Sequence, residues 1–310
     1  MEYCLGIDTS NYTTSLAAVP VSGGELYSVR RLLATPEKQV GLRQSDAHFL
    51  HMKNLPELFS QLREQLPPDA TFVRVGVSTR PRGVEGSYMP CFLAGVATAH
   101  AAAFSASAQV FETSHQEGHL AAALYGCPQF PVRDRFYAMH LSGGTMELLE
   151  VTTVSSGYDV KLKLATLDVT AGQLVDRIGV LMGLQFPCGR ALDAMALCSK
   201  KRLPNLPLRL KEGGINLSGV ENRAKTYLDA GESLEDVAAF VFAQIARAIS
   251  ALLDEADGNL PLLLCGGVSA SAYLKRALTD ERIFFTDPSL ATDNAVGVAL
   301  LTREKGGNLR

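Results

Sequence analysis

The sequence lacks several features that would assign it to a common class of protein. Its six cysteines include no CxxC pair, which indicates buried, reduced thiols rather than disulfides or a zinc knuckle. The net charge is −3, so the chain carries no overall basic footprint for nucleic acid. No run suggests a membrane span, and no signal-peptide pattern follows Met1. We therefore expect a cytoplasmic protein without a membrane partner.

What the chain does have is length and apolar content. Its 310 residues exceed one typical core and 47% of them are hydrophobic, so two lobes are expected. Residues 3–19 and 136–151 share a strand-turn-strand pattern, with small hydroxyl and glycine residues in each turn. Such turns can present backbone N–H groups to a phosphate. Although hairpins are common, this pair suggests two similar α/β lobes facing one cleft.

Hydrophobic periodicity predicts most of the remaining elements. It predicts helices over residues 46–66, 89–106, 115–124, 169–183, 189–197, 234–255 and 292–303. Strands are predicted over residues 71–77, 109–111 and 260–265, and an ordered loop over 201–218. The last of these strands leads through Gly266-Gly267 into a helix, a turn that can bring a helix N-terminus to a nucleotide.

The most informative motif is His115-Gln116-Glu117-Gly118-His119. Two imidazoles at positions i and i+4 share one helix face and can converge on a metal ion. In zinc peptidases the catalytic glutamate directly follows the first histidine, whereas Glu117 lies two residues on and points away from that face. The motif therefore argues against a peptidase. Two solvated or core histidines remain the alternative.

Taken in order, the motifs resemble the tRNA threonylcarbamoyladenosine transferase family, whose bacterial member is TsaD. They are Gly6-Ile7-Asp8-Thr9-Ser10, His115 to His119, Leu141-Ser142-Gly143-Gly144, Ala171-Gly172-Gln173 with Asp176-Arg177, Pro187-Cys188-Gly189, Gly266-Gly267-Val268 and Thr292-Asp293-Asn294. The resemblance implies the α/β fold of actin, hexokinase and acetate kinase, with duplicated mixed-sheet lobes around a central cleft. We expect an N-terminal lobe over residues 1–132, completed by a helix over 293–310, and a C-terminal lobe over 133–292.

The resemblance also implies the site residues. The metal ligands, for iron or zinc, would be His115, His119 and Asp293, although Asp293 could be only a helix cap. His140 takes the place of a tyrosine ligand of archaeal members, and a histidine bonded within its own hairpin is the alternative. The adenine nucleotide or acyl-adenylate would bind at Ser142, Gly143, Gly144, Asp176, Gly189 and Asp193, with Gly266, Gly267 and Ser271 beside them. No catalytic residue is assigned.

Several positions depart from the family pattern. They are Asn11, Tyr12 and Thr13 in place of an acidic stretch, Thr145 for His or Asn, Gln173 for Glu, Glu221 for Lys and Ser271 for Asn. These changes alter the charge where the family is expected to handle its acceptor, so the chain resembles a divergent paralogue.

The leading hypothesis is metal-dependent transfer of a threonylcarbamoyl group from an acyl-adenylate to adenosine in tRNA. It implies tRNA, a TsaB-like subunit and an adenylate-forming enzyme as partners. The small residues of the helix over 89–106, among them Gly95, would suit the subunit's docking surface, and packing of this helix on its own sheet is the alternative. One alternative is a carbamoyltransferase of the same fold with another acceptor, and the other is a noncatalytic scaffold. Candidate basic patches for RNA are residues 80–82 and 200–202, although such runs are most often solvated faces.

Overall fold

The computed structural model describes residues 1–10, 12–34, 42–131, 133–155, 157–256, 258–292 and 294–307. Two of the positions singled out above, Asn11 and Asp293, lie outside these ranges. The chain divides into two units, each of which is described by itself. The first contains Met1–Gly126, Val154–Asp159 and Thr292–Arg310, and the second contains Cys127–Thr153 and Val160–Ala291.

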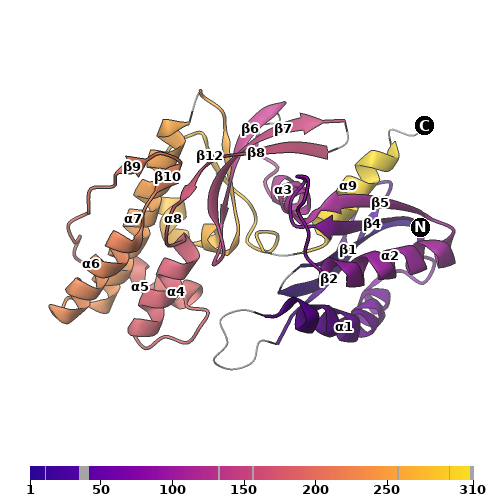
Figure 1. The fold of residues 1–310 in the computed structure, drawn as a ribbon, viewed down its shortest axis with the longest axis horizontal. Helices are drawn as coiled ribbons and strands as arrows, with labels where there is room; N and C mark the ends of the chain where they lie inside the picture. Colours follow the sequence, from indigo (N-terminus) through magenta and orange to yellow (C-terminus); the bar gives the residue numbers. More distant parts are fainter. Residues whose placement is uncertain are drawn as a thin grey trace. The chain divides into compact units, whose positions relative to one another are not determined.

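The first unit is a mixed sheet with helices on both faces (Figure 1). Its strands are β1 (Glu2–Thr9), β2 (Thr13–Pro20), β3 (Tyr27–Leu32), β4 (Thr71–Arg80) and β5 (Gln109–Ser114). Their order is β3-β2-β1-β4-β5, and β1, β4 and β5 are parallel. Every residue of β2, and all of β1 except Glu2, is buried, as expected for strands covered on both faces.

Successive residues of β1 point to opposite faces of the sheet, so different residues of this strand contact the helices on each face. Gly6 faces α9 (Val296–Gly307), whose backbone approaches so closely that a Cβ atom would collide with Ala295 and Ala299. Thr9 points to the opposite face and contacts Gly95 of α2 (Phe92–Ala106). The helix α1 (Gln44–Gln65) packs beside α2, whereas α3 (His115–Tyr125) packs beside α9.

The second unit repeats this topology. Its first three strands, β6 (Arg135–Leu141), β7 (Met146–Val154) and β8 (Gly157–Thr166), are consecutive neighbours. Then β11 (Leu262–Cys265) pairs parallel to β6, and β12 (Ile283–Phe285) pairs parallel to β11. The short strands β9 (Leu210–Lys211) and β10 (Gly214–Ile215) extend the far edge. The two predicted duplicated hairpins are thereby confirmed.

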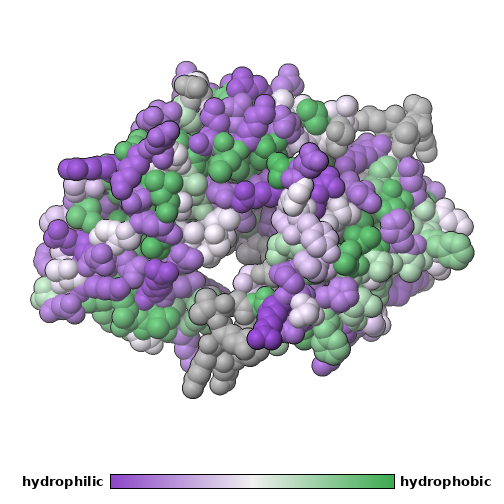
Figure 2. Space-filling view, in the orientation of Figure 1, coloured by the Kyte–Doolittle hydropathy of each residue, from purple (hydrophilic) through white to green (hydrophobic). Residues whose placement is uncertain are grey.

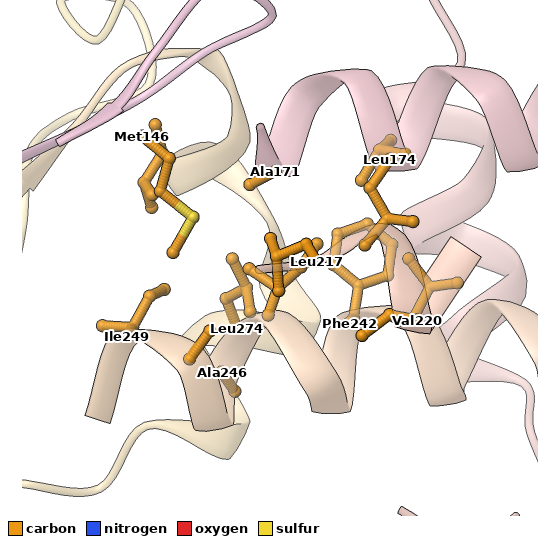
Figure 3. Packing of buried hydrophobic residues seen from close by; sticks show 14 of the residues in the cluster. Met146, Ala171, Leu174, Leu217, Val220, Phe242, Ala246, Ile249 and Leu274 are labelled. Carbon is orange, nitrogen blue, oxygen red and sulfur yellow. The ribbon is translucent and has the colours of Figure 1, made fainter. Parts of the chain in front are cut away.

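The helices of the second unit share one large core (Figure 3). They are α4 (Ala171–Leu181), α5 (Gly189–Leu197), α6 (Ser218–Asp229), α7 (Leu234–Glu255) and α8 (Ala272–Ala277), with the 3-10 helix η1 (Gly267–Ala270) before α8. Figure 3 shows Phe242, Ala246 and Ile249 along α7, facing Leu174 of α4 and Leu274 of α8. Burial of this apolar surface is the main force that holds the unit together.

The expectation that no segment of the chain is long and apolar enough to span a membrane needs correction. The helix α7 is long and apolar enough to cross a membrane, with a mean hydropathy of 1.6 over its best window. However, 78% of that window is buried inside the protein, as in the core helix of a soluble protein. The cytoplasmic location stays a prediction.

The long helices and the strands at the centres of the sheets are confirmed, with ends shifted by up to four residues. Four elements were not predicted from the sequence, because their short or mixed patterns carry little periodicity: β3, β8, α6 and β12. Residues 201–218 contain β9 and β10 as well as loop. Five cysteines are buried and unpaired as predicted, whereas Cys198 is exposed at the end of α5.

Candidate functional site

The imidazole pair lies where the strand β5 turns into the helix α3. Ser114 caps this helix, and Glu117 completes a capping box with it. The Oε2 atom of Glu117 accepts hydrogen bonds from the backbone N–H of Ser114 at 2.8 Å and from its hydroxyl at 2.7 Å. Glu117 therefore serves the helix terminus and not the imidazoles, in agreement with the argument against a peptidase.

The two rings converge as the i, i+4 spacing predicts. The Nε2 atoms of His115 and His119 are 3.0 Å apart, and the ring planes are inclined by 72°. Two nitrogen ligands with bonds of about 2.1 Å are about 3.0 Å apart at the 90° angle of an octahedral ion, and about 3.4 Å apart at a tetrahedral zinc ion. The pair therefore matches an octahedral ion such as iron and lies within about 0.4 Å of the separation that zinc requires.

Asp8 lies behind this pair, and the sequence motifs predicted no role for it. It lies near the end of β1, with Ser78 of β4 at the adjacent register position, and it is fully buried. The Oδ1 atom of Asp8 is 3.0 Å from Nδ1 of His115. The same oxygen accepts a hydrogen bond from the Ser78 hydroxyl. A carboxylate at the end of a buried strand was the signal that could have identified it.

The third predicted ligand, Asp293, lies outside the described residues. Within the described ranges, no group of three His, Cys, Asp or Glu side chains could hold a metal. His115 and His119 can supply two ligands, and the role of Asp293 stays a prediction.

The second unit gathers the predicted nucleotide residues at the carboxyl ends of β6 and β11. Ser142, Gly143 and Gly144 form the turn after β6, and Gly266 begins the turn after β11 with φ of +89°. A Cβ atom on Gly266 would collide with the carbonyl oxygen of Leu141, so only glycine lets these turns approach. Ligands of open α/β sheets bind at this edge.

The turn of Ser142 to Gly144 is held from behind by the first residues of α4. The backbone N–H of Gly172 donates to the carbonyl of Ser142 at 3.2 Å. The Thr170 hydroxyl donates to the carbonyl of Gly143 at 3.1 Å. Added Cβ atoms on Gly143 and Gly144 would meet nothing within 4 Å, so this side of the turn is open.

The two predicted carboxylates have different surroundings. Asp176 is half-buried, and burial raises its pKa, although the N–H of Cys188 lowers it by donating to Oδ1 at 2.8 Å. Asp193 instead caps α8: it accepts hydrogen bonds from Ser271 and from the backbone N–H groups of Ala272 and Tyr273. Asp176 is therefore the freer acceptor for a ligand hydroxyl.

Other predicted nucleotide residues lie nearby in the same unit. Gly189 is the first residue of α5, where an added Cβ atom would meet open space. Gly267 is exposed in η1. Ser271 is buried, and its hydroxyl also accepts from the Leu274 N–H, so it caps α8 together with Asp193.

His140 belongs to a chain of hydroxyl groups. The Ser142 hydroxyl oxygen accepts from the N–H groups of Gly144 at 3.2 Å and Thr145 at 3.1 Å. Both lone pairs of the Ser142 oxygen are thus occupied, so its hydroxyl donates a hydrogen bond to the Thr145 hydroxyl oxygen at 3.0 Å. Thr145 then donates to Nδ1 of His140 at 3.0 Å. This arrangement favours a histidine bonded within its hairpin, and a metal role for His140 stays a prediction.

Two departures from the family pattern have a structural explanation. Gln173 forms the capping box of α4 with Thr170, a role that an amide fills as well as a carboxylate. Glu221 accepts from Arg177 at 2.9 Å and Lys225 at 2.6 Å. Burial raises the pKa of Glu221, and these two cations outweigh that effect and lower it.

The architecture identifies the fold class. It is the α/β fold of actin and hexokinase, built from two sheets with the same strand topology. Component A of (R)-2-hydroxyglutaryl-CoA dehydratase from Acidaminococcus fermentans superposes with a TM-score of 0.56 at 14% identity, covering 99% of this chain and all of the other. HypF of T. kodakarensis superposes with a TM-score of 0.60 at 12% identity, covering 99% of this chain and 47% of its own. Such identities show the fold alone.

The sequence then defines the family. A family model described as TsaD, tRNA N6-adenosine threonylcarbamoyltransferase, matches residues 39–300, and the chain belongs to this acyltransferase family. The relative of that name from Bordetella parapertussis is 30% identical, over 97% of this chain and 91% of its own length. The one from Aromatoleum aromaticum is 28% identical, over 95% of this chain and 89% of its own.

Proposed function

We propose that this protein transfers a threonylcarbamoyl group from an acyl-adenylate to the exocyclic amine of an adenosine in tRNA. The observation that carries the proposal is the converging pair His115 and His119, at the carboxyl edge of a sheet in a chain of this family. In the reaction, the amine forms a bond to the carbamoyl carbon. The bond from that carbon to the phosphate oxygen breaks, and AMP leaves.

The residues of the first unit supply the metal site of this proposal. His115, His119 and, by resemblance, Asp293 would hold an iron or zinc ion, which when bound polarises a carbonyl group as a Lewis acid. His119 is 9% exposed, and the side chain of His115 is 20% exposed, so water reaches the pair only in part. Partial exclusion of water strengthens the electrostatic effect of any charge placed there.

The residues of the second unit supply the adenylate site. Within the described part of the chain the Gly143 N–H makes no hydrogen bond, and its nitrogen lies on the side of the turn that faces Gly172. The opposite side, at the Cα atoms of Gly143 and Gly144, is open, so a phosphate could approach the turn there. Asp176 would accept a ribose hydroxyl, while Gly189 leaves room for the ligand to approach.

A second candidate is a carbamoyltransferase that uses another acceptor. The observation that favours it is Glu221, which stands where the family has lysine and binds Arg177 and Lys225. These two cations compensate the carboxylate and are engaged by it, whereas a lysine at this position could contact a phosphate. A polyanionic acceptor such as tRNA would therefore be held less tightly there.

The partners follow from the same proposal. The net charge of −3 predicts weak, salt-sensitive binding of tRNA by the chain alone. Of the proposed basic patches, Lys201 is already paired with Glu232 at 2.7 Å. A TsaB-like subunit and an adenylate-forming enzyme would complete the system.

The face of α2 that is available to a partner is not the face that carries Gly95. Gly95, expected to face a partner, packs on its own sheet against Thr9 and Val77. The exposed face of α2 carries Leu93 and Phe104, exposed by 48% and 90%. Figure 2 shows apolar side chains, in green, over the region of the first unit where Figure 1 draws α1 and α2. We propose this face as the partner surface.

The test of the activity is reconstitution. The full chain is combined with ATP, threonine, bicarbonate, an adenylate-forming enzyme, a TsaB-like subunit and tRNA, and the nucleosides are then identified by mass spectrometry. We expect threonylcarbamoyladenosine. Consumption of the adenylate with unmodified tRNA would support the other acceptor instead.

The test of the partner surface uses one variant and one control. Phe104→Glu should prevent assembly with the subunit and modification of tRNA. Leu162→Glu, at a 53% exposed position of β8, should affect neither. Normal assembly of Phe104→Glu would exclude this face.

A further inference from the structure

We propose that Asp8 is a positioning residue for the imidazole pair. Its carboxylate holds a proton on Nδ1 of His115 and so turns the Nε2 lone pair of that ring toward a divalent metal ion. The inference rests on the metal site proposed above, and it concerns a residue that lies behind the ligands.

The topology of the first unit places Asp8 at this site. The strands β1, β4 and β5 are parallel neighbours, so their carboxyl ends meet at one edge of the sheet. Asp8, Ser78 and His115 occupy or directly follow these three ends. Asp8 also points to the same face as Gly6, the face covered by α9 and α3, because alternate residues of a strand share a face.

The hydrogen bonds of Asp8 decide where the proton of His115 lies. An ionised carboxylate can only accept hydrogen bonds, so Nδ1 of His115, 3.0 Å from Oδ1, must be the donor. A neutral imidazole protonated at Nδ1 has its lone pair at Nε2. That Nε2 atom faces Nε2 of His119 at 3.0 Å, where the two rings would meet a metal ion. Imidazole ligands commonly have their second nitrogen fixed by a carboxylate in this way.

The charge of Asp8 supplies a second, independent observation. The side chain is fully buried, and within the described part of the chain its Oδ2 atom has no hydrogen-bond partner. The elements packed around Asp8 bring His115 from α3, His51 from α1 and Cys91 beside α2. Among the residues that the structure describes, no lysine or arginine forms an ion pair with Asp8. A buried carboxylate without a full cationic partner is costly. A cation on the far side of the His115 ring would offset that cost through the polarised N–H.

This arrangement makes metal binding and the charge of Asp8 mutually dependent. The carboxylate makes His115 a stronger ligand, and the bound ion compensates the buried carboxylate. A purely structural role, in which Asp8 only joins β1 to β4 through Ser78, predicts no such dependence. The dissociation constant of the metal therefore separates the two roles.

The experiment compares the full-length protein with Asp8→Asn and Ser78→Ala. Each protein is stripped with a chelator, checked for its fold by circular dichroism, and titrated with Zn²⁺ and with Co²⁺ against a competing chelator. Asp8→Asn keeps the shape and an acceptor oxygen but removes the charge. We expect its dissociation constant to rise by about 10- to 100-fold, and that of Ser78→Ala to change by less than about threefold. The visible spectrum of bound Co²⁺ reports the ligand geometry directly.

A measurement on the wild-type protein keeps the test independent of whether a variant folds. With ¹⁵N-labelled histidine, the ring-nitrogen shifts of metal-free His115 should show a protonated Nδ1 and an unprotonated Nε2. The opposite tautomer would overturn the role of Asp8, and so would an unchanged dissociation constant in folded Asp8→Asn. A wild-type protein that binds neither ion would instead remove the proposed metal site, and this inference with it.

Discussion

His115 in the first unit and His140 in the second both form a hydrogen bond through Nδ1, but with partners of different chemistry. Both use Nδ1, and both find an oxygen 3.0 Å away. For His115 that oxygen belongs to the carboxylate of Asp8, which can only accept. For His140 it belongs to the hydroxyl of Thr145, which donates because Ser142 already donates to it. In the tautomers that we propose from these bonds, the His115 ring has its lone pair at Nε2, and the His140 ring carries an N–H there.

The difference shows that the neighbour of an imidazole decides whether the ring can act as a metal ligand. A histidine motif in the sequence reveals the ring and not its tautomer. On this basis His115 is suited to hold a cation, and His140 is suited to donate a hydrogen bond. The predictions below test that distinction, from the largest expected effect to the smallest.

The largest effect is expected from His119→Ala. Loss of one imidazole of the pair should weaken metal binding by at least about 100-fold, because a direct ligand matters more than the groups behind it. Elemental analysis of the purified proteins measures the occupancy, with His140→Gln as the matched control that retains the metal. Equal occupancy in wild type and His119→Ala would refute the pair, and loss of metal from His140→Gln would refute the distinction between the rings.

A third histidine extends the comparison to stability. His51 of α1 is fully buried with Nδ1 2.8 Å from the Thr14 hydroxyl, and burial lowers its pKa to about 4. Between pH 6.5 and 4 the unfolded chain binds a proton that the folded protein does not. The free energy of unfolding should therefore fall as the pH drops through this window, by up to about 3 kcal/mol.

Chemical denaturation at a series of pH values measures this slope. His51→Gln should flatten it, whereas the control His100→Gln, at an exposed position of α2, should leave it intact. An unchanged slope in His51→Gln would assign the acid sensitivity to other groups.

The turn of Ser142 to Gly144 packs on Gly172 at the start of α4, so a larger residue at position 172 should displace the turn. A Cβ atom on Gly172 would lie 2.5 Å from the Ser142 carbonyl oxygen and the Gly143 nitrogen. Gly172→Ala should cost about 1–3 kcal/mol of stability. It should also weaken the stabilisation by AMP or ATP in thermal-shift titrations, since the turn would move. Gly219→Ala in α6, where the Cβ atom meets open space, is the control, and equal behaviour of the two variants would contradict the packing argument.

The smallest effect is expected from Thr145→Val. It removes the donor to Nδ1 of His140 at a cost of about 1 kcal/mol. The ring-nitrogen shifts of His140 should change toward a mixture of tautomers, while those of His115 stay unchanged. Thr152→Val, on the strand β7 that follows this turn, is the control. A wild-type His140 with its proton on Nδ1 would show that the hydroxyl chain runs in the opposite direction.

The order of motifs along the sequence was sufficient for the family and the fold class, and periodicity was sufficient for long elements such as α7. These properties are local: a buried helix needs an apolar face every 3.6 residues, and a close turn needs glycine. The convergence of His115 and His119 was predictable for the same reason, because four residues of helix fix their separation. Short strands such as β12 were not predictable, since three residues show no period.

Only the tertiary structure decided how the site residues are used. Asp8 and His115 are 107 positions apart, and only the pairing of β1, β4 and β5 brings them within a hydrogen bond. Asp193 could be a ligand carboxylate by sequence, but the fold places it at the N-terminus of α8, where it caps the helix. Gly95 faces its own sheet and not a partner. A side chain's type is written in the sequence, whereas its hydrogen-bond partners and burial depend on which distant elements pack around it.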